Sequence, residues 1–105
     1  MRQPTNPFDP VLLSQVRLGV MSILMTREEV SFSDLRSLLG LTQGNLGSHL
    51  QNLEKAGYIT IEKSFVDRKP RTTARIAPAG RTAFRQHVAT LDEIVRSSGD
   101  EEDES

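Results

Sequence analysis

Apolar and polar residues follow two different periods along the chain, and the change of period separates the predicted elements. Up to residue 57, apolar residues recur every three or four positions, which is typical of helices that bury one face. The first such run extends from Pro10 to about Met25, and a proline suits the first turn of a helix. Its apolar stripe comprises Leu12, Leu13, Val16, Val20, Ile23 and Leu24. The next apolar residues, "VSF" at 30–32, are too few for a helix and predict a small strand.

Two further helices are predicted with only a few residues between them. Ser33 is a plausible cap for a short helix that ends at Gly40. Thr42 then caps a longer helix, which runs to about Ala56 and is stopped by Gly57. A short helix, a tight turn containing glycine ("GLT") and a second helix together predict a helix-turn-helix.

Beyond residue 57 the apolar period changes to two, which is typical of a β-strand. Residues 59–65 alternate in this way, "VDRKPR" at 66–71 interrupts the pattern as a turn, and "TTARI" at 72–76 resumes it. These three segments predict a β-hairpin with a basic tip.

A final helix is predicted from Pro78, and its apolar residues form a narrow seam of the coiled-coil kind. The seam contains Phe84, Val88, Leu91 and Val95, with His87 and Ile94 in the neighbouring row. The predicted fold is therefore mainly α with a small β-hairpin (α+β), a winged helix-turn-helix.

Composition indicates one domain with an appendage at each end. Residues 1–9 predict a flexible N-terminal arm, residues 10–96 the folded domain, and residues 97–105 a disordered acidic tail. The formal net charge is -1, but five of the 14 acidic residues lie in that tail. The remainder has nine acids against 13 Lys and Arg, so the body of the protein carries a charge of +4.

Several classes of site and location are excluded or disfavoured. The chain has no cysteine, which excludes disulfides, thiolate metal sites and cysteine nucleophiles. No apolar run approaches the roughly 18 residues that span a bilayer, and the N-terminus has no apolar signal core. His49 and His87 lie on different predicted helices without a carboxylate pattern for acid-base chemistry. We therefore expect a cytoplasmic protein that is not an enzyme, needs no metal or cofactor and contacts no membrane.

The helix that begins after Thr42 has an outer face without bulk or negative charge. Three leucines occupy its inner side, whereas the outer side offers glycines and small or amide side chains, with no carboxylate before Glu54. Glycine costs a helix interior about 1 kcal/mol relative to alanine, so these glycines need a reason. Asn, Gln and Ser can hydrogen-bond base edges, and a bare backbone can approach a groove wall closely. We expect this face to enter the major groove of DNA through Thr42, Gln43, Gly44, Asn45, Ser48, His49 and Asn52.

Cations gather on the predicted hairpin. Between Lys63 and Arg75 there are five Lys and Arg against one acid, Asp67. Cations at a hairpin tip can straddle a phosphate backbone or reach into a minor groove. The residues expected to contact DNA are Lys63, Arg68, Lys69 and Arg71.

Both features have plainer interpretations. The glycines could allow tight packing against a neighbouring element, and the polar helix face could be ordinary solvated surface. The hairpin charges could protect strand edges against aggregation. Ordinary solvated helix faces are, however, usually rich in Lys and Glu, and both features would lie on one side of a winged helix.

Four segments closely resemble the winged-helix transcriptional regulators of the MarR and ArsR superfamily, especially small MarR-like proteins without a sensor domain. They are "FDPVLLSQVRLGVMSIL", "LLGLTQGNLGSHLQNLEKAGYI", "KSFVDRKPRT" and "IAPAGRTAF". The resemblance implies that residues 42–56 are the recognition helix, that 66–71 form the wing and that the terminal helices build a homodimer. Relatives often have threonine in place of Ala77 and an aromatic near Ala74, but neither departure touches the DNA-facing set. The cysteines and histidine clusters of metal-sensing relatives are absent, so no metal sensing is implied.

The seam of the last helix is too narrow to cover a core alone, and we expect it to pair with a second copy of the chain. The interface would comprise Val11, Leu12, Phe84, Val88, Leu91, Ile94 and Val95. A homodimer would place two recognition helices about 34 Å apart, one turn of DNA, on a palindromic site. The alternative is that the seam folds back onto its own domain.

These patterns favour a DNA-binding transcriptional regulator, with repression as the expected mode and double-stranded DNA as the partner. The alternative function is a winged-helix protein–protein interaction module without specific DNA binding. Salt-dependent binding to duplex DNA separates the two functions. The sequence identifies no small-molecule effector, and the acidic tail could either mimic DNA weakly or simply add solubility.

Overall fold

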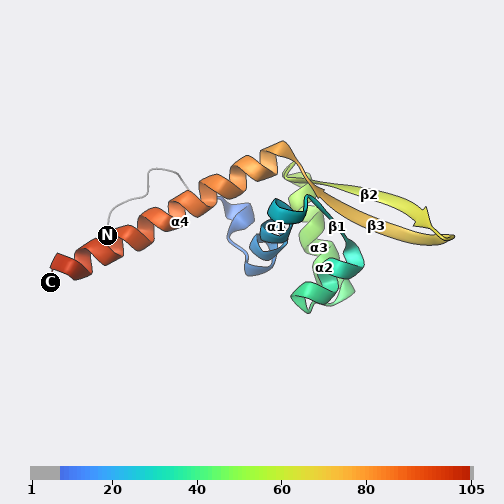
Figure 1. The fold of residues 1–105 in the computed structure, drawn as a ribbon, viewed down its shortest axis with the longest axis horizontal. Helices are drawn as coiled ribbons and strands as arrows, with labels where there is room; N and C mark the ends of the chain where they lie inside the picture. Colours follow the sequence, from blue (N-terminus) through green and yellow to red (C-terminus); the bar gives the residue numbers. More distant parts are fainter. Residues whose placement is uncertain (1–7, 105) are drawn as a thin grey trace.

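The computed structural model describes the backbone of residues 8–104 and the side chains of residues 8–98. Within that part of the chain, four α-helices pack with a three-stranded antiparallel sheet (Figure 1). Figure 1 shows the β2–β3 hairpin extending from the helical body in one direction and α4 extending in the other. The elements are a 3₁₀ turn η1 (Pro10–Leu12), α1 (Gln15–Arg27), β1 (Glu29–Ser31), α2 (Phe32–Leu39), α3 (Gln43–Lys55), β2 (Ile59–Val66), β3 (Lys69–Ile76) and α4 (Pro78–Glu104).

The helix-turn-helix is confirmed, with one correction at its start. Thr42 caps α3 by accepting a hydrogen bond from the backbone N–H of Asn45 at 3.2 Å. Gly40 ends α2 in the left-handed conformation, with φ of 64°, which glycine adopts without a Cβ penalty. The cap of α2 is Ser31 rather than Ser33, because the Ser31 hydroxyl accepts from the Asp34 N–H at 3.2 Å and leaves Phe32 as the first helical residue.

The first predicted helix is divided into two. Asp9 accepts the Val11 N–H at 2.9 Å and starts the short turn η1. Ser14 then interrupts the helical path with an extended backbone and caps α1 by accepting the Arg17 N–H at 3.2 Å. A serine side chain competes for backbone donors in this way, so it favours a cap over a helix interior.

The strand order in the sheet is β1-β3-β2, with β3 in the centre. Residue pairing in the hairpin runs from Ile59 opposite Ile76 to Val66 opposite Lys69. The predicted six-residue turn at 66–71 is therefore a turn of two residues, Asp67 and Arg68, both with positive φ (52° and 67°). Positive φ at both central positions matches the twist of the flanking strands, which allows β2 and β3 to pair along their full length.

One continuous core lies beneath the helices and the base of the sheet. The leucines of α3 are buried in it, as the periodicity predicts. Leu12, which was predicted to lie in a dimer interface, is 1% exposed and belongs to this core instead, because η1 turns its side chain inward. The core residues are Leu12, Val20, Met21, Leu24, Val30, Leu35, Leu46, Leu50, Leu53, Ile59, Ala74 and Ile76.

Tyr58 connects three parts of the fold. Its hydroxyl donates to the Asp9 carboxylate, with the two oxygens 2.5 Å apart. This hydrogen bond, burial and the nearby carboxylate charge raise the pKa of Tyr58 to about 12. Its backbone carbonyl accepts the Ala77 N–H at 3.0 Å and lies against Gly80, where an added Cβ would collide with it. Gly80 is therefore required for α4 to cross the start of β2 this closely.

The predicted ends of the domain differ from the structure at two points. Asp9 was assigned to the flexible arm, but its two hydrogen bonds, to Val11 and Tyr58, attach it to the domain. The predicted disordered tail at 97–105 is helical as far as Glu104, because helix propagation from an established helix is easier than nucleation. Residues 1–7 of the predicted arm and Ser105 of the tail lie outside the described residues. Between residues 8 and 104, no helix has both the length and the apolar character needed to cross a membrane.

The close approach at Gly80 leads to a stability prediction. Gly80→Ala should lower the free energy of unfolding by about 2 kcal/mol, because a backbone carbonyl cannot easily move away from the added methyl group. Denaturant unfolding followed by circular dichroism would measure this change. Gly44→Ala adds the same group where nothing lies within 4 Å, so it is the matched control and should not destabilise. Equal stability of the Gly80→Ala variant and the parent protein would contradict the packing of α4 described here.

Candidate nucleic-acid interface

The outer face of α3 is open and free of negative charge along its first turns. Gln43, Gly44, Asn45 and Ser48 are exposed, as the sequence predicts. An added Cβ at Gly44 or at Gly47 would meet nothing within 4 Å. Tight packing against the described part of the chain therefore does not explain the two glycines. What they provide is an uncovered stretch of helix surface.

A groove of about 590 Å³ runs between α3 and the hairpin. One wall is α3, including both glycines and Ser48, and the other is the sheet, including Ile61 and Lys63. The structure thus brings part of the predicted helix set and one predicted cation to a single concave surface. Its lining residues are Phe32, Gln43, Gly44, Gly47, Ser48, Leu50, Gln51, Glu54, Ile61, Lys63 and Thr72.

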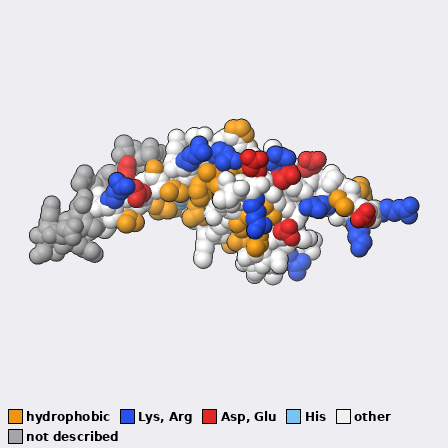
Figure 2. Space-filling model, in the orientation of Figure 1, with side chains coloured by type: hydrophobic (Ala, Val, Ile, Leu, Met, Phe, Trp, Pro, Cys, Tyr) orange, Lys and Arg blue, Asp and Glu red, His pale blue; other side chains and the backbone are white. Residues whose placement is uncertain are grey.

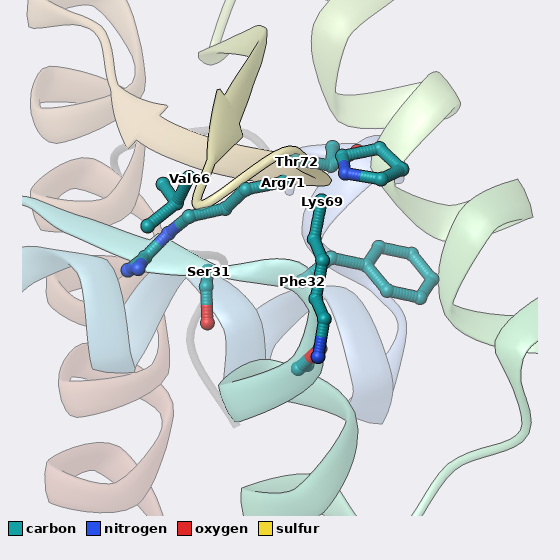
Figure 3. A pocket seen from close by; sticks show the side chains of 8 residues that line it. Ser31, Phe32, Val66, Lys69, Arg71 and Thr72 are labelled. Carbon is teal, nitrogen blue, oxygen red and sulfur yellow. The ribbon is translucent and has the colours of Figure 1, made fainter.

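The cations of the hairpin do not all lie on the same side. Alternation along the paired strands puts Lys63 on the face toward α3, and Lys69 and Arg71 on the opposite face. Figure 3 shows Lys69 extending beside Phe32 toward the start of α2, whereas Arg71 points another way, past Val66. The sequence prediction treated these cations as one group. Strand alternation divides them between the two faces.

Arg68 lies at the very end of the hairpin. It is exposed and occupies the second position of the two-residue turn, between the exposed residues Asp67 and Lys69. In Figure 2, Lys and Arg side chains project from the hairpin end, beyond the groove-forming body of the molecule. A charge in this position can reach a surface that the helices cannot.

His49 differs from the other predicted contact residues of α3, because it is half-buried and faces α1. Its Nδ1 lies 3.1 Å from Nη1 of Arg17, which also donates from Nε to the Val11 carbonyl at 2.6 Å. Burial, and then the charge of Arg17, lower the pKa of His49 below its usual value. His49 therefore links α3 to α1, whereas Asn52 on the same helix is exposed.

Several residues of the groove are not among the predicted contact residues. Gln51 falls at the edge of the predicted outer face, one helical turn after Gly47, so the periodicity of α3 already points to it. The sequence predicts Phe32 in a small strand and Thr72 in the hairpin, and it predicts no DNA contact for either residue. Both line the groove only because α2 and β3 pack side by side, and a local pattern does not contain that information.

A second surface, on α4, carries exposed apolar side chains. Val88, Leu91 and Val95 of the predicted seam are exposed, and Val95 is 68% exposed. Phe84 and Ile94 are half-buried, and Phe84 packs against the core of its own chain together with Val11. The predicted interface residues thus divide into an exposed apolar strip on α4, the half-buried Ile94 beside it, and Val11, Leu12 and Phe84, which belong to or pack against the core.

The described side chains form no group of three or more His, Cys, Asp or Glu that could hold a metal ion. His87 is buried, and among the described residues its Nδ1 has no hydrogen-bond partner. His87 lies on α4 and is not one of the residues that line the groove beside α3.

Comparison with known proteins identifies the family. The family model of the winged helix DNA-binding domain matches residues 16–95. An uncharacterised protein from Methanocaldococcus jannaschii is 35% identical over 84 residues, which cover 80% of this chain and 91% of that protein. A solved structure described as a transcriptional regulator homologue from Pyrococcus horikoshii OT3 is 34% identical, with a TM-score of 0.79 over 83% of this chain and 86% of that one.

More distant structures share the fold. MepR, described as a transcription regulator of the Staphylococcus aureus multidrug efflux pump MepA, is 17% identical, with a TM-score of 0.68 over 84% of this chain and 64% of that one. BldR, a transcriptional regulator from Sulfolobus solfataricus, is 21% identical, with a TM-score of 0.68 over 82% of this chain and 60% of that one. The chain therefore belongs to the family of winged helix DNA-binding domains, and its structural neighbours are transcriptional regulators of the MarR type.

Proposed function

We propose that the protein represses transcription by binding a palindromic duplex site as a homodimer, with α3 in the major groove and the hairpin on the adjacent backbone. One observation carries this proposal. The open, carboxylate-poor start of α3 shares one groove with Lys63 of the hairpin, and the helix side of that groove contains two glycines that no described part of the chain covers. An apolar or acidic protein partner would not require this combination, whereas a polyanionic double helix does.

The polar residues of α3 supply the means to read bases. Gln43 and Gln51 line the groove, and each amide can donate and accept to one adenine edge. Ser48 lies between them, and Asn45 and Asn52 are exposed on the other flank of the helix. Glu54, the one acid of the groove lining, belongs to the last turn of α3, farthest from the glycines. We place the base contacts on the first three turns for this reason.

The hairpin supplies phosphate contacts. Arg68 lies at the tip, where it could enter a minor groove. Lys63 would face the DNA strand that lies in the groove between α3 and the sheet. Lys69 and Arg71, which both lie on the other face of the hairpin, would bind phosphates on that side. Thr42 adds an exposed hydroxyl at the start of α3, where the helix dipole favours an anion.

The dimer would form through the exposed strip of α4. Val88, Leu91 and Val95 lie on one long helix, and Leu13 adds a further exposed apolar side chain after η1. Joining two copies through such a strip would leave both α3 helices free, about 34 Å apart on one side of a duplex. The cytoplasm, where such a regulator meets its DNA, is the location that this proposal implies.

The rival function, a winged helix that binds another protein, has the same exposed strip on α4 in its favour. It gives no role to the bare start of α3 or to the cations at the hairpin end. Binding to duplex DNA that weakens steeply with salt distinguishes the two functions directly.

The glycines of α3 give a test in which stability and binding should change in opposite directions. Gly44→Ala and Gly47→Ala should each raise the free energy of unfolding by about 1 kcal/mol, because alanine favours a helix. Each substitution should also weaken DNA binding by roughly tenfold, because the added methyl group keeps α3 from lying close to the wall of the DNA major groove and so disturbs its base contacts. Thr82→Ala on the exposed side of α4 controls for added helix propensity. Unchanged affinity in both glycine variants would remove the main argument for major-groove entry.

The wing can be tested through the salt dependence of binding. Arg68→Ala combined with Lys69→Ala should reduce the slope of log affinity against log salt by about 0.9 for every phosphate contact removed. Fluorescence anisotropy with a labelled duplex, repeated over a range of salt concentrations, measures that slope. Arg75→Ala is the matched control, since Arg75 is also a β3 cation but pairs with Glu29 at 2.6 Å. Identical slopes for the double variant and the parent would reject the wing assignment.

The dimer can be tested by sedimentation velocity at micromolar concentration. The parent protein should sediment as a dimer, and Val95→Asp should convert it to a folded monomer by placing a charge in the apolar strip. Arg96→Ala, which removes only an exposed i,i+4 ion pair with Asp92, should leave the dimer intact. A parent protein that stays monomeric throughout this range would overturn the dimer proposal.

A further inference from the structure

The outer part of the hairpin has a large apolar side chain that stays mostly exposed in the described part of the chain. Phe65 is 77% exposed, and the neighbouring Val66 is 46% exposed. Figure 2 shows hydrophobic side chains among the charged ones on the hairpin end. An exposed phenylalanine contributes little to folding and adds an aggregation hazard. Its presence on a hairpin that is otherwise rich in cations therefore calls for a functional explanation.

The pairing of the strands makes Phe65 part of a small apolar surface. Phe65 lies opposite Pro70, and Val66 opposite Lys69 closes the two-residue turn. In such a hairpin the closing pair is hydrogen-bonded and the next pair is not, so Pro70 sits where its missing N–H costs no ladder bond. Side chains of a non-hydrogen-bonded pair approach each other most closely. Phe65 and Pro70 thus form one apolar plate, here called the wing plate.

The wing plate faces the same side as the groove. Strand alternation puts Phe65 on the face of β2 that carries Ile61 and Lys63, and both of those residues line the groove beside α3. Pro70 lines the neighbouring hollow, of about 360 Å³, together with Phe32 and Lys69. A strand of DNA leaving the α3 groove toward the hairpin end would pass over this plate.

The charges around the plate indicate what covers it. Lys63 on the same face and Arg68 in the turn are exposed within two residues of Phe65 or Pro70, and Lys69 and Arg71 flank Pro70 on the opposite face; the turn has one acid, Asp67. A partner that satisfies both features needs apolar surface directly beside negative charge. The sugar–phosphate backbone has this character, because the C–H edges of deoxyribose alternate with phosphates along each strand.

We propose that Phe65, supported by Pro70, packs against deoxyribose at the edge of the minor groove and supplies a part of the binding free energy that salt does not screen. This inference rests on the proposed DNA-binding function and assigns a contact of a different physical kind from the cationic ones. Apolar side chains of this type are used at minor grooves in other DNA-binding architectures. Arg68 then contributes charge at the same place, and Phe65 contributes contact area.

The variant that tests this is Phe65→Ser, with Val66→Ser as the matched control on the opposite face of the same strand. The probes are the duplex recovered from a random pool by the parent protein and a mixed-sequence duplex of about 30 base pairs. Phe65→Ser should weaken binding about tenfold at every salt concentration without changing the salt slope. Val66→Ser should change affinity by less than about twofold, and both variants should keep the parent's thermal midpoint, since both side chains are exposed.

Hydroxyl-radical footprinting gives a direct readout, because the radical attacks deoxyribose. The parent should protect sugars at the hairpin position as well as those around α3, and Phe65→Ser should lose only the hairpin protection. Unchanged affinity and footprint in Phe65→Ser would overturn the inference, and so would a changed salt slope, which would mean that Phe65 only positions the cations. If Phe65→Ser changed the sedimentation coefficient of the protein but not its DNA affinity, Phe65 would belong to a self-association surface, and the inference would also be overturned. Failure of the parent to bind either duplex would instead overturn the proposed function.

Discussion

Burial of the leucines of α3 is the constraint on which the rest of the interface depends. Leu46, Leu50 and Leu53 are all buried in the core, and each fully buried leucine contributes about 1.5–3 kcal/mol. Their shared face fixes the rotation of α3 about its axis, so the positions left outside are determined at the same time. Because Thr42 fixes where the helix begins, the polar face can neither shift along the helix axis nor rotate about it without exposing the buried leucines.

The hairpin is held by the same core at its base and is free at its tip. Ile59, Ala74 and Ile76 are buried, whereas every residue from Glu62 to Arg71 is exposed. Because the tip is built on paired strands, its side chains keep a defined direction even though no other element covers them. The turn suits this arrangement, since positive φ at Asp67 and Arg68 matches the twist of the paired strands up to the tip. An exposed contact surface can therefore be positioned without a packed environment of its own.

Local patterns predicted the helix-turn-helix well because its determinants lie close together in the sequence. The Thr42 cap, the Gly40 terminator and the leucine period of α3 each involve residues within four positions of one another. The prediction was less accurate where distant segments meet. The burial of Leu12 depends on η1 folding back onto the domain, and the role of Phe32 depends on β3 packing beside α2. The predicted turn is too long because the run "VDRKPR" interrupts the alternation of apolar and polar residues, although its residues at 69–71 pair with β2 and Pro70 fits a non-hydrogen-bonded pair.

The hairpin carries two kinds of side chain, cationic and apolar, and these would contribute to DNA binding in different ways. In the proposed complex, long-range attraction from Arg68, Lys69 and Arg71 would not depend on base sequence, and salt would weaken it. An apolar contact from Phe65 acts only at short range, so it requires the duplex to be seated against α3 before it forms. The cations would then govern encounter, and the glycine-bearing helix and the wing plate would govern how closely the seated duplex fits. On this argument the exposed phenylalanine is the part of the hairpin that depends most on correct docking, because its contribution disappears when the groove between α3 and β2 is not filled.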